Sequence, residues 1–391
     1  MTRPVHIVAA RRTPIGRFIG GLAELSSSAL GAIAVRQVLA DSAVDPATID
    51  EVIIGQVLTA GAGMNPARQA AIGGGLPIHV PAFTVNKVCG SGLKAIHLGT
   101  QAIAAGDAEL ILAGGQESMT QAPHLLAGRR ASKLGDVTAT DSIMVDGLVD
   151  AFNHVAMGIT AEGLATKFGL SREAQDGFAL ASHQKAVAAA AAGRFAAEIA
   201  PVTVTERREQ RLVVADEQPR ADTTLAALAR LKPAFEQAGT VTAGNAASLN
   251  DGAAAVLLAS EARAIELGLT SLGRIVSTAS AALEPMEMGL GAATAAQRAL
   301  DRAGWHSSDV DLIELNEAFA AQALAVMAAM HWAPERVNVN GGAIALGHPI
   351  GASGCRVVVT LLHEMQRRNV RRGLATLCIG GGQGVAVCIE R

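Results

Sequence analysis

The stretch Gly90–Ser118, "GSGLKAIHLGTQAIAAGDAELILAGGQES", holds the pattern that decides the fold. Its first glycines and Ser91 predict a turn. The run that follows, as far as Gly106, carries Lys94 as its one charge, so we expect a helix that is buried on most sides. "ELILAGG" is then typical of a buried strand that ends in paired glycines. The stretch therefore predicts a helix followed by a strand in the interior of an α/β domain.

The same order recurs near the C-terminus. "GASG" at 351–354 opens the apolar run "CRVVVTLLHEM", and "GLATLCIGGGQG" at 373–384 again reads as a buried strand followed by glycines. Ser91-Gly92 would match Ser353-Gly354, and Gly114-Gly115 would match Gly380-Gly381. This self-similarity predicts two related α/β halves.

Three further runs are typical of buried strands: "EVIIGQV" at 51–57, "AVLLA" at 255–259 and "DLIEL" at 311–315. Strands that alternate with helices favour layered α/β sheets. The more polar segment from 118 to 249 breaks this rhythm and is interpreted as loops and alanine-rich helices inserted into the first half. We therefore expect residues 1–117 with 250–270 as the N-terminal half, 118–249 as an inserted loop domain over the active site, and 271–391 as the C-terminal half.

The composition excludes several classes of protein. The chain has 391 residues, is 50% hydrophobic and carries a formal net charge of −3, so no global attraction to nucleic acid or acidic membranes is expected. The basic clusters Arg207-Arg208 and Arg367-Arg368 are interpreted as solvated faces. No apolar run reaches membrane-spanning length, and a strand-like run begins by His6, which leaves no room for a signal peptide. We expect a soluble, cytoplasmic protein without membrane contact.

Four cysteines stand at 89, 355, 378 and 388, without a CxxC pair or a Cys/His spacing that suits a metal ion. Neither a disulfide framework nor a metal site is expected. Cys355, in a helix-like run, and Cys388, in "VAVCIER", are typical of core positions. Cys89 and Cys378 differ from them because both stand at glycine-rich turns.

Four short segments are candidates for chemistry: "NKVCGSG" with Cys89, "NEAFAAQ" with Asn316, "NGGAIALGHPIGASG" with His348, and "CIGGGQG" with Cys378. Each has a structural alternative. Cys89 could be a core residue, His348 a turn histidine, Asn316 the N-cap of a helix, and "GGGQG" a flexible turn.

Together the four segments fit acyl transfer. A thiol at a helix N-terminus feels the positive end of the helix dipole and nearby backbone N–H groups, which lower its pKa. The same N–H groups can hold an oxyanion when Cys89 attacks a carbonyl carbon. His348 could accept the thiol proton. Cys378 could act as acid or base toward a carbon acid, a step that simple hydrolysis does not need.

These segments occur in the order found in the thiolase family, and the chain resembles that family over essentially its whole length. The resemblance also rests on "AARRTPIGRFIGGL" near the start, "GGQESMT" at 114–120, "ADEQPRADTTLAALARLKPAF" at 215–235 and "GTVTAGNAASLNDGAAA" at 239–255. It implies two similar halves in an α-β-α-β-α layered arrangement, with a loop domain inserted in the first half.

The resemblance also implies a role for each catalytic candidate. Cys89 would carry the acyl group, and His348 would activate it and donate to the substrate thioester oxygen. Asn316 would hold a water of this first oxyanion hole. The N–H groups of Cys89 and Gly380 would form a second hole, and Cys378 would move a proton at the α-carbon. Coenzyme A contacts would come from Leu148, Met157, Arg220, Phe235, Ala243, Ser248, Leu249, Met288, Ala318 and Phe319.

The implied activity is that of the biosynthetic members: reversible Claisen condensation of two acetyl-CoA to acetoacetyl-CoA and CoA, with coenzyme A thioesters as substrates and no metal or redox cofactor. The alternative within the family is a degradative 3-ketoacyl-CoA thiolase of broader chain length. A decarboxylating ketoacyl synthase normally has a histidine or asparagine in place of Cys378. A non-catalytic acyl-CoA-binding protein would be favoured if one of the four catalytic groups were missing.

The resemblance implies a homodimer or homotetramer, because residues 118–142 are similar to the loop that joins dimers into tetramers. Three positions depart from the biosynthetic pattern. Ala156 replaces a histidine, Ala247 replaces a serine, and Ala292 replaces a proline. The first two concern the coenzyme A tunnel, so they bear on acyl-chain and coenzyme contacts.

Overall fold

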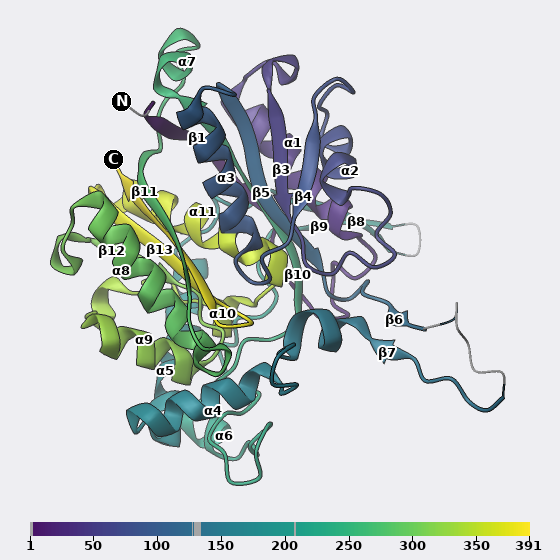
Figure 1. Ribbon diagram of the computed structural model, residues 1–391, viewed down its shortest axis with the longest axis vertical. Helices are drawn as coiled ribbons and strands as arrows, with labels where there is room; N and C mark the ends of the chain where they lie inside the picture. The colour runs from purple at the N-terminus through teal and green to yellow at the C-terminus, as the bar shows by residue number, and fades with distance from the viewer. Residues whose placement is uncertain (1–2, 127, 129–133, 207–208) are drawn as a thin grey trace.

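The computed structural model describes residues 3–126, 128, 134–206 and 209–391, and it has the predicted mixed α/β architecture (Figure 1). The strands of the first half lie in the order β4–β3–β5–β10–β1, and those of the second half in the order β12–β13–β14–β11. β1 and β11 pair antiparallel only from Val5 with Ile275 to Ile7 with Gly273, and this short ladder joins the halves into one ten-stranded sheet. The strand bounds are β1 Val5–Arg12, β2 Gly16–Arg17 (paired with β10), β3 Glu51–Gly55, β4 Ala82–Val85, β5 Leu110–Ser118, β10 Asn250–Ser260, β11 Gly273–Ala282, β12 Leu312–Leu315, β13 Arg372–Ile379 and β14 Gln383–Glu390.

The two halves repeat one topology. In each, an antiparallel pair (β5 with β10, β13 with β14) has a parallel neighbour, β3 beside β5 and β12 beside β13. β4 continues the first half in parallel beside β3, whereas in the second half a single parallel bridge from Ile313 to Val337 occupies that place. The predicted duplication is therefore visible in strand order, although the second half, residues 271–391, has only that bridge in place of a counterpart to β4.

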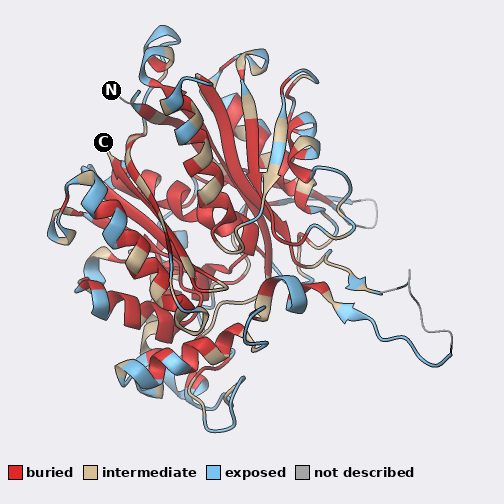
Figure 2. Ribbon diagram, in the orientation of Figure 1, coloured by how far each residue is buried: buried red, intermediate tan, exposed pale blue. Residues whose placement is uncertain are grey.

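Helices form layers on both sides of these strands. α3 (Ser91–Ala105) and α11 (Ile350–Arg368) pack on each other between the halves, and both also contact strands. α1 (Ser27–Ser42) and α2 (Pro66–Gly73) cover the outer side of the first half, and α8 (Gly291–Ala303) and α9 (Ala320–Met330) lie at that of the second. This is the predicted α-β-α-β-α order, and both the α3–α11 layer and the strands beside it are mostly buried (Figure 2).

Glycines allow α3 and α11 to cross closely. A Cβ on Gly92 would lie 2.7 Å from the Cys355 nitrogen, and a Cβ on Gly354 would lie 2.3 Å from the Leu93 nitrogen. The contact is thus reciprocal between the two matched Ser-Gly pairs. Such separations are far below van der Waals contact, so no larger residue fits without moving a helix.

The prediction that the strand after α3 ends at Gly114-Gly115 is wrong, since β5 runs on to Ser118. Gly114 and Gly115 do not form a turn; they allow neighbouring backbone segments to pack closely against β5. A Cβ on Gly115 would stand 2.2 Å from the carbonyl oxygen of Gly351, at the start of α11. The strand can continue because this residue has no side chain to block the helix.

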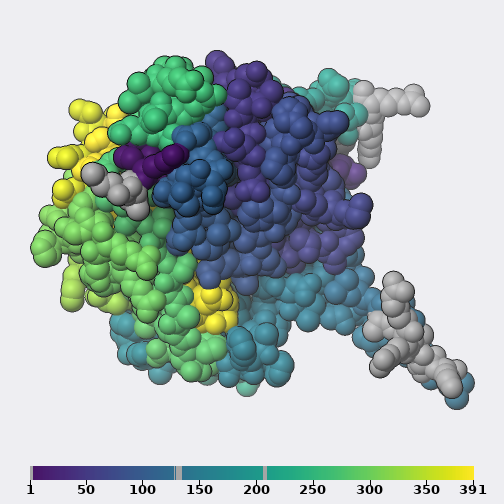
Figure 3. Space-filling model, turned by 45° about the horizontal axis from the view of Figure 1, so that its top comes forward, coloured from purple at the N-terminus to yellow at the C-terminus, as the bar shows by residue number. Residues whose placement is uncertain are grey.

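The chain between β5 and β10 forms elements outside the main sheet, namely β6 (His124–Leu125), β7 (Thr140–Asp141), the π-helical turn η3 (Met144–Leu148), α4 (Met157–Phe168), α5 (Arg172–Ala191), β8 (Val202–Glu206), β9 (Glu209–Val213) and α6 (Leu225–Ala229). The β6–β7 pair projects from the body of the molecule (Figures 1 and 3). The exact boundaries at 118 and 249 stay a prediction. Arg207, Arg208 and part of the 118–142 segment lie outside the described residues.

The remaining short elements are η1 (Pro46–Thr48), α7 (Glu261–Glu266), η4 (Pro285–Leu290), η5 (Ser307–Asp309), η6 (Pro334–Arg336) and α10 (Ala343–Leu346). The second basic cluster is exposed, as predicted, and both of its members, Arg367 and Arg368, pair with Glu364 on α11. Within the described ranges, each helix is too short or too polar to cross a membrane.

Candidate active site

A cavity of about 310 Å³ lies where the insertion meets both halves of the sheet. Four of the five predicted catalytic residues line it: Cys89, His348, Cys378 and Gly380. The fifth, Asn316, lies behind the lining and contacts His348. Residues from both repeats are thus brought to one site.

Cys89 stands in a tight loop between β4 and α3. Val88, just before it, has a φ of 46°, which is an unusual backbone angle for a β-branched residue. The side chain of Asn86 accepts a hydrogen bond from the Val88 nitrogen at 2.9 Å. Ser91 Oγ accepts from the Lys87 nitrogen and donates to the Val88 carbonyl, both at 2.7 Å. These bonds hold the strained loop and present the thiol to the cavity.

The expectation of a lowered thiol pKa is wrong for the ligand-free protein. Cys89 precedes the first residue of α3 by two positions, and burial raises its pKa to about 11. Hydrogen bonds from the backbone N–H groups of Gly380 and of Cys89 itself act in the opposite direction, but they do not offset burial. The thiol is therefore protonated at neutral pH and needs a base before it can attack. The same two N–H groups converge on the sulfur, where a bound acyl oxygen would also need donors.

His348, the buried base candidate, lines the same cavity as this thiol and lies in the link between α10 and α11. Its backbone nitrogen donates to Asn250 Oδ1 at 2.9 Å, and its Nδ1 lies 2.6 Å from Ser353 Oγ. Burial, with a smaller contribution from the charge of Arg356, lowers the pKa of His348 to about 3. The imidazole is neutral at pH 7 and has a nitrogen free to accept a proton.

Asn316 directly follows β12, and its backbone nitrogen donates to Thr376 on β13 at 3.1 Å. Its Nδ2 lies 3.4 Å from His348 Nε2. Among the described residues its buried Oδ1 has no hydrogen-bond partner, so this atom can accept from a water or a substrate group. The alternative that Asn316 caps a helix is wrong, because α9 begins at Ala320 with Phe319 as its N-cap.

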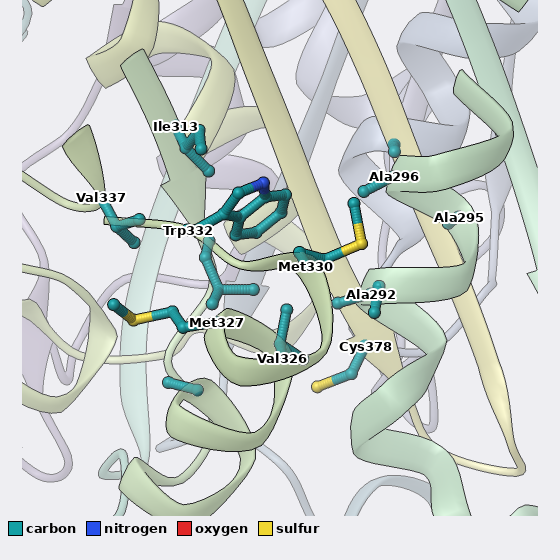
Figure 4. Close-up of a cluster of buried hydrophobic side chains, with 14 of the residues drawn as sticks. Ala292, Ala295, Ala296, Ile313, Val326, Met327, Met330, Trp332, Val337 and Cys378 are labelled. Carbon is teal, nitrogen blue, oxygen red and sulfur yellow. The ribbon is translucent and has the colours of Figure 1, made fainter. Parts of the chain in front are cut away.

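Cys378 lies near the end of β13, where one side of the strand packs into the core. Its neighbours in that apolar cluster include Ala292 and Val326 (Figure 4). Burial raises the pKa of the Cys378 thiol, and the nearby Cys89 raises it further. The side chain is thus a protonated thiol that faces both the core and the cavity.

Most of the residues implied for coenzyme A binding do line the cavity, and its wall is strongly apolar. They are Leu148, Met157, Phe235, Ser248, Leu249, Met288, Ala318 and Phe319. Arg220 and Ala243 are exposed and do not belong to the lining. The backbone nitrogen of Arg220 donates to His183 Nδ1 at 3.2 Å, which fixes the chain there without bringing it to the cavity.

Two aromatic rings narrow the cavity. Phe235 and Phe319 meet edge to face, with ring centroids 6.1 Å apart and planes at 80°. The Phe235 ring lies over Gly158, where a Cβ would stand 2.2 Å from it. Glycine at this position therefore lets the insertion place an aromatic wall close to α4.

Eight lining residues were not among the predicted binding residues: Met119, Met144, Gly147, Ala156, Gly158, Ala246, Ala247 and Ile350. Ala156 and Ala247 are two of the three departures from the family pattern, and this departure is the signal that the sequence offers for them. Met144 and Ile350 carry no chemical signal in the sequence, since a cavity-lining apolar residue looks like a core residue.

Glu117, the penultimate residue of β5, connects the segment after β3 with the start of α11, next to the lining residue Ile350. Its carboxylate accepts from the nitrogens of Val57 at 3.0 Å, Leu58 at 3.2 Å and Gly351 at 2.9 Å. Burial raises its pKa to about 7.

Across the described parts of the chain, no group of three or more His, Cys, Asp or Glu side chains is arranged to hold a metal ion.

Comparison with known proteins agrees with this geometry. Residues 5–262 match the thiolase N-terminal domain and residues 269–391 the thiolase C-terminal domain. An acetyl-CoA acetyltransferase of Pseudomonas aeruginosa is 61% identical and a probable acetyl-CoA acetyltransferase of Escherichia coli 58% identical, the alignments covering 99% and 100% of this chain and 99% of each relative.

Two solved structures share the fold over the whole chain. The Bacillus anthracis acetyl-CoA acetyltransferase superposes with a TM-score of 0.98 and the human mitochondrial 3-ketoacyl-CoA thiolase with 0.97, both at 42% identity. The first match covers 100% of this chain and the second 99%, and each covers 99% of the solved chain. The two family domains span nearly the full sequence in the order that the duplicated halves require, and the chain belongs to the thiolase family.

Proposed function

We propose that this chain is an acetyl-CoA C-acetyltransferase that catalyses the reversible condensation of two acetyl-CoA to acetoacetyl-CoA and CoA. One observation carries the proposal: two cysteines from equivalent strand-and-helix units, a neutral histidine and two backbone donors meet in one apolar cavity. Both curated relatives named above are called acetyl-CoA acetyltransferases, one of them as probable. Nothing in the cavity favours the degradative alternative.

In the first half-reaction, His348 Nε2 takes the Cys89 proton, and the thiolate attacks the acetyl carbonyl carbon. The carbonyl oxygen gains negative charge near the N–H groups of Cys89 and Gly380, which support that charge. The bond from the acetyl carbon to the CoA sulfur breaks, and the CoA thiolate takes the proton of Cys378. Acetyl-Cys89, an imidazolium and a Cys378 thiolate result, so charge and protons balance.

In the second half-reaction, the Cys378 thiolate removes a methyl proton from a second acetyl-CoA. The enolate oxygen is stabilised by the imidazolium Nε2–H of His348 and by a water on Asn316, whose Oδ1 has no other partner among the described residues. The enolate carbon attacks the acetyl group on Cys89. The carbon–sulfur bond breaks, and Cys89 recovers its proton from His348. Covalent capture makes this carbon–carbon bond formation effectively unimolecular.

The pantetheine arm would lie along the apolar wall of Leu148, Met157, Phe235 and Leu249. Arg220 and Ala243 are exposed outside the cavity, so in this proposal they contact the nucleotide end of coenzyme A. Ala156 and Ala247 line the cavity without a polar side-chain atom. This tunnel therefore relies on apolar contact where most biosynthetic relatives would offer an imidazole and a hydroxyl.

We infer a cytoplasmic enzyme that needs no metal or redox cofactor and assembles as a homodimer or homotetramer. The projecting β6–β7 arm exposes Leu126 and Val137, which are 59% and 48% accessible, and burial of such side chains would favour contact with another copy.

A thiolysis assay across 3-ketoacyl-CoA chain lengths tests the proposed activity. We expect the highest kcat/KM for acetoacetyl-CoA and a fall with each added pair of carbons, because in this proposal Met288 and Phe319, which line the cavity, limit the room for the acyl chain. Equal or rising kcat/KM toward long chains would instead assign the degradative activity. No thiolysis of any chain length would reject both.

A further inference from the structure

We propose that Ser353 is a positioning residue for His348: its hydroxyl oxygen accepts a hydrogen bond from Nδ1–H and leaves Nε2 as the nitrogen that exchanges a proton with Cys89. The inference rests on the proposed function, in which His348 is the base. Ser353 lies in the first turn of α11 and is 1% exposed, so solvent does not compete for its hydroxyl.

A series of hydrogen bonds, each with a defined donor and acceptor, determines the tautomer of the His348 ring. Asn316 presents Nδ2, a donor, to His348 Nε2 at 3.4 Å, so an unprotonated Nε2 is the form that suits it. The ring proton then lies on Nδ1, 2.6 Å from Ser353 Oγ. The Ser353 hydroxyl in turn donates to the Pro349 carbonyl oxygen at 2.9 Å. The opposite tautomer would point Nε2–H at the Asn316 amide protons.

The position of the hydroxyl is itself fixed by the fold. Gly354, next to Ser353, packs against the α3 backbone at Leu93, and this close crossing stops α11 from sliding or turning. The His348 backbone nitrogen is anchored on Asn250, a residue of the first half, at 2.9 Å. Two anchors on the rigid scaffold therefore determine where the ring stands and which way it faces.

The hydrogen bond from Nδ1 to Ser353 is the same in both charge states of the ring. After His348 takes the Cys89 proton, Nδ1–H still donates to Ser353, and Nε2–H, which the Asn316 Nδ2 cannot accept, is donated to a substrate oxygen. The hydroxyl does not need to rotate between the two half-reactions. Ser353 therefore contributes to acylation of Cys89 and to the oxyanion contact without touching the substrate.

The test compares Ser353→Ala and Ser353→Thr with the control Thr100→Ala. Thr100, on the equivalent helix α3, makes the same kind of bond, from Oγ1 to the carbonyl oxygen four residues earlier, at 2.8 Å. The acetylation rate of Cys89 is followed by acid quench and mass spectrometry. We expect Ser353→Ala to slow acetylation by roughly 10- to 100-fold, Ser353→Thr to recover most of the rate, and Thr100→Ala to match wild type.

A second readout does not depend on any substitution at 353. Nitrogen NMR of the histidine-labelled wild-type enzyme, with the His348 signals identified by their loss in His348→Ala, reports which ring nitrogen carries the proton. We expect a proton on Nδ1 in the free enzyme. A proton on Nε2, or a Ser353→Ala rate equal to that of Thr100→Ala, would overturn the inference. Normal acetylation of His348→Ala would instead overturn the proposed function beneath it.

Discussion

The starts of α3 and α11 share one local structure, a Ser-Gly pair, but they support two different candidate groups, a thiol at α3 and an imidazole at α11. Each carries a Ser-Gly pair whose glycine lies against the other helix. At α3, Ser91 bonds the loop that presents Cys89. At α11, Ser353 bonds the ring of His348. The duplicated fold therefore places the proposed nucleophile and the proposed base near matching points, at the start of each of the two helices that cross.

The strand ends next to these helices differ more strongly. The penultimate residue of β5 is Glu117, whose carboxylate accepts hydrogen bonds from three backbone nitrogens. The penultimate residue of β13 is Cys378, a thiol on the cavity wall. One copy of the strand carries a structural carboxylate and the other carries the thiol proposed as the α-carbon base. Duplication thus gives similar backbone positions, and the residue at each position determines the chemistry proposed for it.

The largest expected effect comes from removing the base. His348→Ala deletes both the proton acceptor and a donor to the thioester oxygen, each typically worth roughly 10²-fold or more, so acetylation of Cys89 should fall by orders of magnitude. Single-turnover acetylation with acetyl-CoA measures it. His97 on α3 is the matched control, because it is also buried and has a lowered pKa of about 4 but does not line the cavity. If His348→Ala acetylates as fast as His97→Ala, the histidine is only structural.

The helix crossing can be broken from either side. Gly92→Ala and Gly354→Ala would each force a Cβ into the backbone of the opposite helix, and overpacking of this kind costs about 1–3 kcal/mol in the free energy of unfolding. Gly163→Ala on α4 is the control, since a Cβ there meets nothing within 4 Å and helix propensity should add about 0.5–1 kcal/mol. Chemical denaturation compares the three. Equal stability of all variants would contradict the reciprocal contact.

A smaller effect is expected in how the stability of the protein depends on pH, because Glu117 near the end of β5 titrates. Because burial raises the folded-state pKa of Glu117 from 4.5 to about 7, its contribution to stability is fully present below pH 4.5 and is lost as the pH rises to about 7. Glu117→Gln cannot titrate. The stability of wild type relative to this variant should therefore fall by about 1–3 kcal/mol across that window. Denaturation midpoints at several pH values measure the difference, and a constant or rising difference would refute the assignment.

Much of this comparison could be read from the sequence. The glycine-bounded helix and strand of each half, their repetition, and the four candidate residues all follow from local patterns, because buried α/β units alternate apolar runs with turns. Ser353 was recognised as the match of Ser91, but its bond to His348 was not, since a hydroxyl four residues into a helix has many possible partners.

The errors have physical causes as well. The pKa of Cys89 was expected to fall because the dipole and amide effects are visible in sequence, whereas burial depends on the tertiary fold. The extension of β5 beyond Gly114-Gly115 was missed because close packing and chain reversal both select glycine. Met144 and Ile350 were missed because apolar cavity walls and apolar cores use the same residues.

The division of labour between Cys89 and Cys378 is the central claim, and one measurement tests it directly. Cys378→Ala is mixed with acetyl-CoA in deuterated buffer, and the acetyl-enzyme and the deuterium content of the acetyl-CoA methyl group are both followed by mass spectrometry. Cys89 should still be acetylated, because His348, the N–H of Gly380 and the helix α3 setting are unchanged, but more slowly, because the leaving CoA thiolate no longer receives the proton of Cys378. Methyl exchange and cleavage of acetoacetyl-CoA should fall by at least roughly 10²-fold for loss of a positioned base, whereas Cys89→Ala should lose acetylation altogether. Near-normal thiolysis by Cys378→Ala, or acetyl found on Cys378 in the wild type with Cys89 free, would contradict the account.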